Sequence, residues 1–203
     1  KLANFDSPIF LPCKGLYSVI KSIAYKNCDA AVVPIENSVE GGVTATLDAL
    51  WKFPELCISK AIVLPIKHAL ISSGKIKDIS EVLSHPQALA QCSQWIAENL
   101  PDAIMLPTNS TSEAVNMVKG SSFRAAIGSQ DASEDLSILA YPINDIEGNC
   151  TRFVLLSKND IKADGNKASM AFSLKSNSPG ALLKALNCIA NLGLNMSRIE
   201  SRP

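Results

Sequence analysis

A carboxylate, an amide and a hydroxyl side chain stand side by side at Glu36, Asn37 and Ser38, just after the apolar run 30–33. The paired glycines at 41–42 let the backbone turn tightly or approach a ligand closely. The apolar run predicts a buried strand, and the residues after the glycines predict a helix. Open α/β sheets bind ligands where a strand gives way to a helix. The segment therefore predicts one wall of a ligand site.

Other polar clusters occupy the same kind of place, at 84–87, 109–111 and 128–130. In a parallel sheet these turns converge at the carboxyl end of the strands. Helix N-termini there would aim unpaired N–H groups at one point, which suits a carboxylate ligand. As single residues, three of them are equally well explained as helix caps: Ser84, Asn109 and Ser110.

The triplet Thr151, Arg152 and Phe153 begins an expected strand directly after the polar loop 145–150. Arginine can grip a carboxylate with two parallel hydrogen bonds, and it can equally form a structural ion pair. Successive side chains of a strand point to opposite faces, so Thr151 and Arg152 cannot face the same ligand without a bulge. If Thr151 faces the ligand, Arg152 is expected to brace the fold.

The spacing of apolar residues predicts the strands and helices that position these side chains. The strands are expected at 30–35, 58–65, 69–72, 81–84, 103–106, 124–128 and 151–156. The helices are expected at 14–26, 43–51, from Pro86 onward, at 111–118 and, as a short one, at 129–134. Such alternation predicts an α/β fold with a mostly parallel sheet. The strands 58–65 and 69–72 are expected to be buried and to carry the chain between two lobes.

Composition narrows the classes of function. The chain has 203 residues, 47% of them hydrophobic, and no net charge, so neither a nucleic-acid-binding nor a membrane-binding surface is indicated. Six widely spaced cysteines without a C-x-x-C pair, and only two histidines, argue against structural zinc and fit a reducing compartment. With no signal-peptide pattern and no membrane-length apolar run, we expect a cytoplasmic protein.

After a polar segment at 158–167, a strand at 168–174, a helix at 179–192 and the start of a strand at 194–199 are expected. Isolated domains of fewer than roughly 40 residues rarely bury a core of their own. We therefore expect residues 168–203 to be the first part of a second small domain.

Read together, these motifs resemble the prephenate dehydratase family, which includes the arogenate-using plant enzymes. The matching pieces, in order, are 33–38 with 41–42, 84–87 with Gln91, 109–111 with Ala114, 126–129, and 151–154. Residues 180–183 and 200–203 resemble the family's regulatory ACT domain, which senses phenylalanine. The family's opening strand and its glycine-rich loop have no counterpart in the sequence, nor does the second half of the ACT domain.

The resemblance implies a two-lobed catalytic domain at 1–157, like the type II periplasmic binding proteins, then a linker at 158–167 and a ferredoxin-like ACT domain at 168–203. The implied reaction removes the ring carboxylate of prephenate as CO₂ and its ring hydroxyl as water, which gives phenylpyruvate. It needs no metal, redox cofactor or covalent nucleophile. The resemblance also implies feedback regulation by L-phenylalanine, bound between ACT domains of a homodimer or homotetramer.

Roles for single residues follow from the same resemblance. Thr151 assists the departing hydroxyl, and Glu36 is a candidate proton source if burial keeps it neutral. The implied substrate-binding residues are Asn37, Ser38, Ser84, Gln91, Asn109, Ser110, Thr111, Arg152 and Phe153. The implied phenylalanine-binding residues are Gly180, Ala181, Leu182, Leu183, Glu200, Ser201, Arg202 and Pro203. We expect His68 to be a core histidine and Glu40 a surface or turn carboxylate.

Two other functions stay open at this point. The chain could prefer arogenate, whose side arm is an amino acid instead of a keto acid. It could also be a non-catalytic ligand-binding module of the same bilobal fold.

Overall fold

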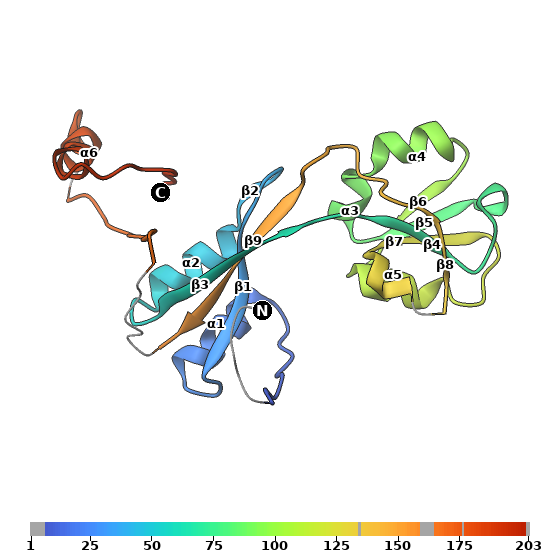
Figure 1. Ribbon diagram of the computed structural model, residues 1–203, viewed down its shortest axis with the longest axis horizontal. Helices are drawn as coiled ribbons and strands as arrows, with labels where there is room; N and C mark the ends of the chain where they lie inside the picture. The colour runs from blue at the N-terminus through green and yellow to red at the C-terminus, as the bar shows by residue number, and fades with distance from the viewer. Residues whose placement is uncertain (1–6, 134, 159–164, 176, 202–203) are drawn as a thin grey trace. The chain divides into compact units, whose positions relative to one another are not determined.

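The structure is a computed structural model that describes residues 7–133, 135–158, 165–175 and 177–201. Within these ranges the chain forms two compact units. Unit 1 contains residues 7–36, 42–62 and 153–201, and unit 2 contains residues 37–41 and 63–152. Figure 1 labels their helices and strands.

Unit 1 is built on a four-stranded sheet of order β2-β1-β9-β3. Its strands are β1 (Ala30–Asn37), β2 (Gly41–Gly42), β3 (Cys57–Pro65) and β9 (Cys150–Ser157). The helices α1 (Leu16–Ala24) and α2 (Thr44–Lys52) bury Ile20, Ile23 and Ala49 against Val33 of β1 and Leu156 of β9. The neighbour of Val33, Val32, is half exposed, because alternate residues of a strand face opposite sides.

Unit 2 is built on a five-stranded sheet of order β6-β5-β7-β4-β8. Its strands are β4 (Ala69–Ser72), β5 (Glu81–Ser84), β6 (Ile104–Pro107), β7 (Arg124–Gly128) and β8 (Ser137–Ala140). The strand β5 pairs in parallel with β6 and β7, whereas β4 is antiparallel to β7 and β8.

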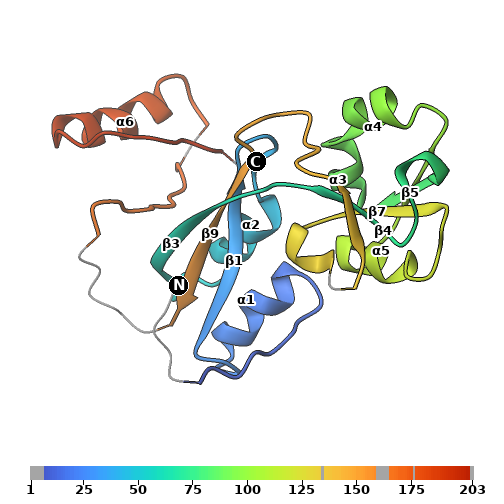
Figure 2. The ribbon, with the colours of Figure 1, turned by 45° about the vertical axis from the view of Figure 1, so that its right-hand side comes forward.

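Helices cover both faces of the unit 2 sheet (Figures 1 and 2). One face packs on α3 (Pro86–Ala90) and α4 (Ser93–Asn99), and the other on α5 (Thr111–Met117). The strands alternate accordingly, so Val82 contacts the first pair of helices and Leu83 contacts α5. Two short 3₁₀ helices, η1 (Ile76–Asp78) and η2 (Gln130–Ser133), complete the unit.

The register of β5 and β6 fixes where the functional turns lie. Ser84 pairs with Pro107, so both strands end at the same edge of the sheet. Thr108 N–H donates to the Ser84 carbonyl at 2.9 Å, which ties the two following turns together. The helix α3 then begins with Pro86 at its first position, a place that proline favours.

The prediction of a mostly parallel sheet was wrong, because the sheets are mixed. Helices join β5, β6 and β7, and only strands joined by such a crossover are expected to be parallel. No helix of the described chain lies between β3 and β4, and β4 runs antiparallel to β7. The expected burial of β3 was also wrong: most of its residues are exposed, since β3 is the edge strand of its sheet.

The expected helix at 179–192 is confirmed as α6 (Ala181–Asn191). The strands expected at 168–174 and 194–199 are not formed in this described part of the chain. A strand is stable only beside partners that accept and donate its hydrogen bonds. Part of the expected linker, 159–164, lies outside the described residues, and among those that are described no helix has the length and apolar character to cross a membrane.

Cys92 is the N-cap of α4 and is fully buried, and burial, aided by the charge of Asp145, raises the pKa of its thiol to about 12. Because the thiolate is the form that attacks alkylating reagents, Cys92 should stay unmodified in the folded protein at pH 8 and react only after unfolding. Cys57 and Cys188 are exposed and should react at once. Timed alkylation with mass spectrometry measures this.

The variant Cys92→Ala provides the control, since it should lose one slowly reacting thiol and no fast one. Labelling of Cys92 at the rate of Cys57 would contradict the buried position.

Candidate functional site

A pocket of about 370 Å³ lies within unit 2, at the edge where β5 and β6 end. Polar side chains form most of its lining: Asn37, His68, His85, Gln87, Gln91, Asn109, Ser110, Thr111 and Thr151, with Ile66 and Ala88. The turns after β5 and β6 therefore converge as the sequence predicts. Among the described lining residues there is no lysine or arginine.

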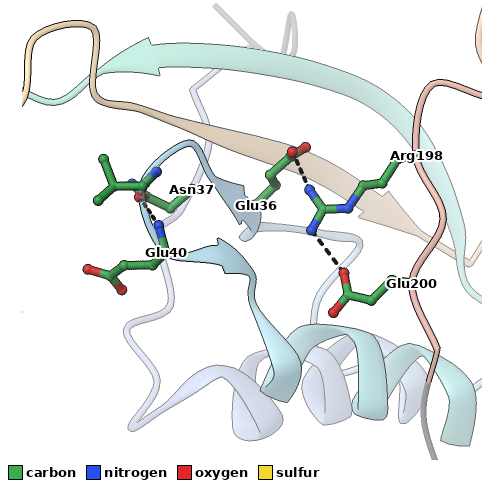
Figure 3. Close-up of polar contacts among 6 residues, drawn as sticks. Glu36, Asn37, Glu40, Arg198 and Glu200 are labelled. Atoms are coloured by element: carbon green, nitrogen blue, oxygen red, sulfur yellow. Dashed lines mark hydrogen bonds and ion pairs between the residues drawn. The ribbon is translucent and has the colours of Figure 1, made fainter.

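Asn37 is the centre of the site, and its amide orientation is fixed by the backbone. Its Oδ1 accepts hydrogen bonds from the backbone N–H groups of Val39, at 2.9 Å, and Glu40, at 3.1 Å; Figure 3 shows the bond from Glu40. The two hydrogens on Nδ2 go to Thr151 Oγ1, at 2.9 Å, and Asn149 Oδ1, at 3.0 Å. All three side chains in this group, Asn37, Asn149 and Thr151, are buried.

Thr151 accepts the hydrogen bond from Asn37, which decides what its own hydroxyl can do. A hydroxyl group has one hydrogen to donate and two lone pairs. Because one lone pair of Thr151 takes the Asn37 hydrogen, the hydroxyl hydrogen can be donated to a ligand in the pocket. The geometry thus leaves the Thr151 hydroxyl hydrogen available for donation toward that ligand.

The hydrogen bonds continue from Asn149 around a closed ring. Asn149 Nδ2 donates to Gln91 Oε1 at 3.1 Å, and Gln91 Nε2 donates to Glu40 Oε1 at 2.9 Å. Glu40 closes the ring with its backbone N–H, which donates to Asn37. Its second carboxylate oxygen accepts from Gln87 Nε2. Every bond of the ring runs in the same direction, an arrangement in which hydrogen bonds strengthen one another.

Two histidines line the same pocket. His68 is buried, and its Nε2 lies 2.9 Å from Gln91 Oε1. His85 is the N-cap of α3, where its Nδ1 accepts from the backbone N–H of Gln87 at 3.3 Å. His68 is buried, as expected of a core histidine, and it also forms part of the pocket wall.

The turn after β6 presents Asn109, Ser110 and Thr111. Ser110 is the N-cap of α5, and its Oγ accepts from Glu113 N–H at 3.1 Å. Its hydroxyl hydrogen can therefore be donated to a ligand, as at Thr151. The Glu113 carboxylate reaches back to Asn109 instead of Ser110, accepting from Asn109 N–H at 2.9 Å. Ser110 and Glu113 thus form one half of a capping box, and the other half goes to Asn109, one residue earlier.

Six of the predicted catalytic and substrate-binding residues line the pocket: Thr151, Asn37, Gln91, Asn109, Ser110 and Thr111. The others are described but are not among its lining: Glu36, Ser38, Ser84, Arg152 and Phe153. Ser84 is fully buried and donates to the Ile127 carbonyl at 2.7 Å, so it serves the sheet. Ser38 pairs with Cys150 through both its backbone and its hydroxyl, which fastens the turn beside Asn37.

Glu36 directs its carboxylate to another partner. It forms an ion pair with Arg198, and Arg198 also contacts Glu200 at 2.9 Å (Figure 3). All three residues belong to unit 1. The Glu200 carboxylate also lies against Gly42, where any side chain larger than hydrogen would meet it. The structure therefore places the Glu36 carboxylate in an ion pair and not in the pocket lining.

The predicted phenylalanine-binding residues fall on two segments of unit 1. Gly180 is the N-cap of α6, and Ala181, Leu182 and Leu183 form its first turn, with both leucines largely exposed. Glu200 is paired as described and Ser201 is exposed. Arg202 and Pro203 lie outside the described residues.

Sequence reasoning missed four functional neighbours: His68, His85, Gln87 and Glu40. His85 and Gln87 lie in the polar cluster 84–87, of which only Ser84 was predicted to bind the ligand. Glu40 was expected to be a surface or turn carboxylate; it is exposed and in a turn, and it also binds two glutamines. Nothing local in the sequence pairs Glu40 with Gln91, because they are 51 residues apart.

Comparison with known proteins gives a consistent result. The family model described as "Prephenate dehydratase" matches residues 3–161. The bifunctional chorismate mutase/prephenate dehydratase of Aquifex aeolicus is 38% identical over 96% of the chain and 54% of its own length. The prephenate dehydratases of Lactococcus lactis subsp. lactis and Methanocaldococcus jannaschii are 39% and 40% identical, over 93% and 94% of the chain and 71% of their own lengths.

Solved structures agree with the sequence relatives. The prephenate dehydratase of Arthrobacter aurescens in complex with L-Phe superposes with a TM-score of 0.81 at 35% identity, covering 95% of this chain and 67% of its own. The enzyme of Staphylococcus aureus gives 0.77 at 30%, covering 96% and 74%. GqqA, described as a novel type of quorum quenching acylase, gives 0.74 at 27%, covering 95% and 72%. The chain spans about half the length of the bifunctional relative and about two thirds to three quarters of the others.

The ring of hydrogen bonds predicts the effect of Asn37→Asp. Aspartate still accepts the two backbone N–H groups, but as a carboxylate it donates nothing to Asn149 or Thr151. Burying these unmatched acceptors should lower the free energy of unfolding by about 1–3 kcal/mol. Urea unfolding measures the loss.

The same change at the exposed Asn166 is the control for Asn37→Asp. We expect Asn166→Asp to change the free energy of unfolding by less than about 0.5 kcal/mol. Equal stabilities of the two variants would show that the ring does not exist in solution.

Proposed function

The chain belongs to the prephenate dehydratase family, and on this premise we propose that it converts prephenate to phenylpyruvate by loss of CO₂ and water. The observation that carries the proposal is the buried Thr151 hydroxyl, which Asn37 orients toward the pocket of unit 2. The proposal follows the family model and the curated relatives, since the structurally related acylase is less similar in sequence.

The proposed reaction requires no covalent bond between the protein and its substrate. Departure of the ring hydroxyl and of CO₂ makes the ring aromatic, which supplies the driving force. The difficult step is the build-up of negative charge on the departing oxygen. A hydrogen-bond donor fixed in advance at that place stabilises the transition state. We assign this task to the Thr151 hydroxyl, as donor of a hydrogen bond, because a threonine hydroxyl is a poor formal acid; the departing hydroxide then takes its proton from solvent to become water.

Neutral donors are proposed to hold the two carboxylates of prephenate. Asn109, Ser110 and Thr111 form one side of the pocket, and Ser110 has its hydroxyl hydrogen available for donation. Gln91 lies in the ring and holds the pocket wall in shape. In this proposal Ser38 and Ser84 support the turns that carry binding residues, and Arg152 and Phe153 brace the strand that carries Thr151.

Glu36 remains the alternative proton source, acting through Thr151. Its carboxylate is paired with Arg198 and is not part of the pocket lining, so the direct hydrogen bond from Thr151 is the simpler assignment. The two assignments differ in what Glu36→Gln does to turnover.

Regulation by L-phenylalanine is proposed for residues 168–203, as the N-terminal part of an ACT domain after a catalytic domain at 1–157 and a linker at 158–167. The related Arthrobacter aurescens structure is a complex with L-Phe, which supports this ligand. We assign it to the start of α6, at 180–183, and to 200–203, in a homodimer or homotetramer. The two-lobed architecture of periplasmic binding proteins and a cytoplasmic location belong to the same proposal.

Replacement of Thr151 tests the central assignment. Thr151→Val keeps the shape and removes the hydroxyl, so kcat for phenylpyruvate formation should fall by about 10²–10³-fold, the usual cost of losing a transition-state donor. KM should change little, because the hydroxyl acts mainly on the departing oxygen. Thr151→Ser restores the donor and should recover most of the activity.

Glu36→Gln is measured in the same assay. If Thr151 acts directly, this variant keeps kcat within about tenfold of the wild type; a loss as large as that of Thr151→Val would assign the proton to Glu36.

Assaying arogenate beside prephenate, as kcat/KM, decides between the two substrates. A folded wild-type protein that binds both without turnover would overturn the enzymatic proposal.

Addition of L-phenylalanine tests the regulatory assignment. A ligand that binds only the folded state raises its stability according to the logarithm of its concentration, so the thermal midpoint should rise with added phenylalanine while dehydratase activity falls. L-alanine is the control and should do neither. An unchanged midpoint in excess phenylalanine would exclude a working site in this chain.

A further inference from the structure

The hydrogen-bond ring at Asn37 permits one assignment of donors and acceptors, and that assignment reaches His68. Backbone N–H groups can only donate, so the two that point at Asn37 Oδ1 identify that atom as the oxygen. Asn37 Nδ2 therefore donates, and Asn149 must present its oxygen to Asn37 and its nitrogen to Gln91.

Gln91 is thereby fixed from two independent sides. Its Oε1 faces the Asn149 amide nitrogen, and its Nε2 faces the Glu40 carboxylate, which accepts. Both contacts demand the same orientation of the Gln91 amide. The atom 2.9 Å from His68 Nε2 is consequently an acceptor, Gln91 Oε1. His68 must carry its hydrogen on Nε2, a role beyond the core histidine that the sequence predicts.

We propose that His68 is a positioning residue for the reaction at Thr151: its Nε2–H holds Gln91 in the one orientation that keeps the ring closed. This inference rests on the proposed function. The backbone that carries the imidazole is anchored, since the His68 backbone N–H donates to Asn144 Oδ1 at 2.7 Å and its carbonyl accepts from Ile143 N–H at 3.0 Å. His68 also directly precedes β4, a fully buried strand.

The other tautomer would oppose this arrangement. With its hydrogen on Nδ1, His68 would place a bare Nε2 against Gln91 Oε1, two acceptors facing each other. Rotation of the Gln91 amide would relieve that contact. It would, however, place Gln91 Nε2 against the Asn149 amide nitrogen and Gln91 Oε1 against the Glu40 carboxylate. The ring would open at Gln91, and Asn149, the partner of Asn37, would lose the acceptor of its own Nδ2.

Two substitutions at His68 separate donation from packing. His68→Leu fills the space without a donor, and His68→Gln places an amide N–H at about the reach of Nε2. We expect kcat to fall on the order of tenfold in His68→Leu, the usual worth of one buried hydrogen bond. KM should stay near the wild-type value, and His68→Gln should recover most of the lost kcat.

Ser72→Ala is the matched control. Ser72 is a fully buried polar residue of β4 outside the pocket, and its hydroxyl bonds to the Arg124 carbonyl. Its removal should lower the thermal midpoint and leave kcat unchanged. Loss of stability alone would therefore not reproduce the kinetic effect expected at His68.

The tautomer is read directly by ¹⁵N NMR of histidine-labelled wild-type protein, which has two imidazoles. Both should show Nε2–H: His68 for the reason given, and His85 because its Nδ1 accepts from Gln87 N–H. His68→Gln assigns the two signals. This measurement needs no activity, so it also decides whether His68 donates if His68→Leu fails to fold.

The outcomes separate the two proposals. An active wild type with an unchanged kcat in folded His68→Leu, or a His68 signal of the Nδ1–H tautomer, would overturn the positioning role. A kcat that His68→Gln does not recover would assign His68 a packing role and overturn it as well. A wild type that forms no product from prephenate or arogenate would overturn the proposed function and with it the positioning role, while the NMR signal still reports whether His68 donates.

Discussion

The amide of Asn37 is the constraint on which the site depends. Two backbone N–H groups of its own turn hold Oδ1, so both hydrogens of Nδ2 must point away from that turn. One of them reaches Thr151, 114 residues further along the chain. The turn at Asn37 thereby supplies the hydrogen bond that one lone pair of the distant Thr151 hydroxyl accepts. The hydroxyl hydrogen of Thr151 is left available for donation. A flexible hydroxyl could turn either its hydrogen or its lone pairs toward a ligand, whereas the hydroxyl of Thr151 is biased to donate.

The unit 2 sheet supplies the second constraint. Because β5 and β6 are parallel and end together, the turns that follow them must share one edge. Side chains from these turns form one side of a pocket without lysine or arginine among its described lining. Neutral donors can stabilise developing charge when they are held in place beforehand. Rigidity therefore matters more here than charge on the lining, and the ring of Asn37, Asn149 and Gln91, closed by the exposed Glu40, provides it.

Local patterns in the sequence were enough to predict most helices and strands, and β5 and β7 were placed to the residue. Strand direction was not predictable in the same way, because alternation predicts parallel strands only where a helix connects them; β4 and β8 have no such connection. Ser110 was predicted as a helix cap, because capping depends only on residues close together in the sequence. The link from Glu40 to Gln91 depends on tertiary packing, and no spacing rule in either segment indicates it.

Ser84 shows why strand-end position alone does not define a binding residue. It stands at the end of β5, as a ligand-binding serine would, yet its hydroxyl donates to the Ile127 carbonyl on the neighbouring strand. His85, the next residue, faces the pocket instead. Since side chains alternate along a strand, adjacent residues at a strand end divide between the sheet and the cavity. The same alternation separates Thr151 from Arg152 at the start of β9, where only the threonine lines the pocket. For a site built this way, the face of the strand decides which of two adjacent polar residues acts on the ligand.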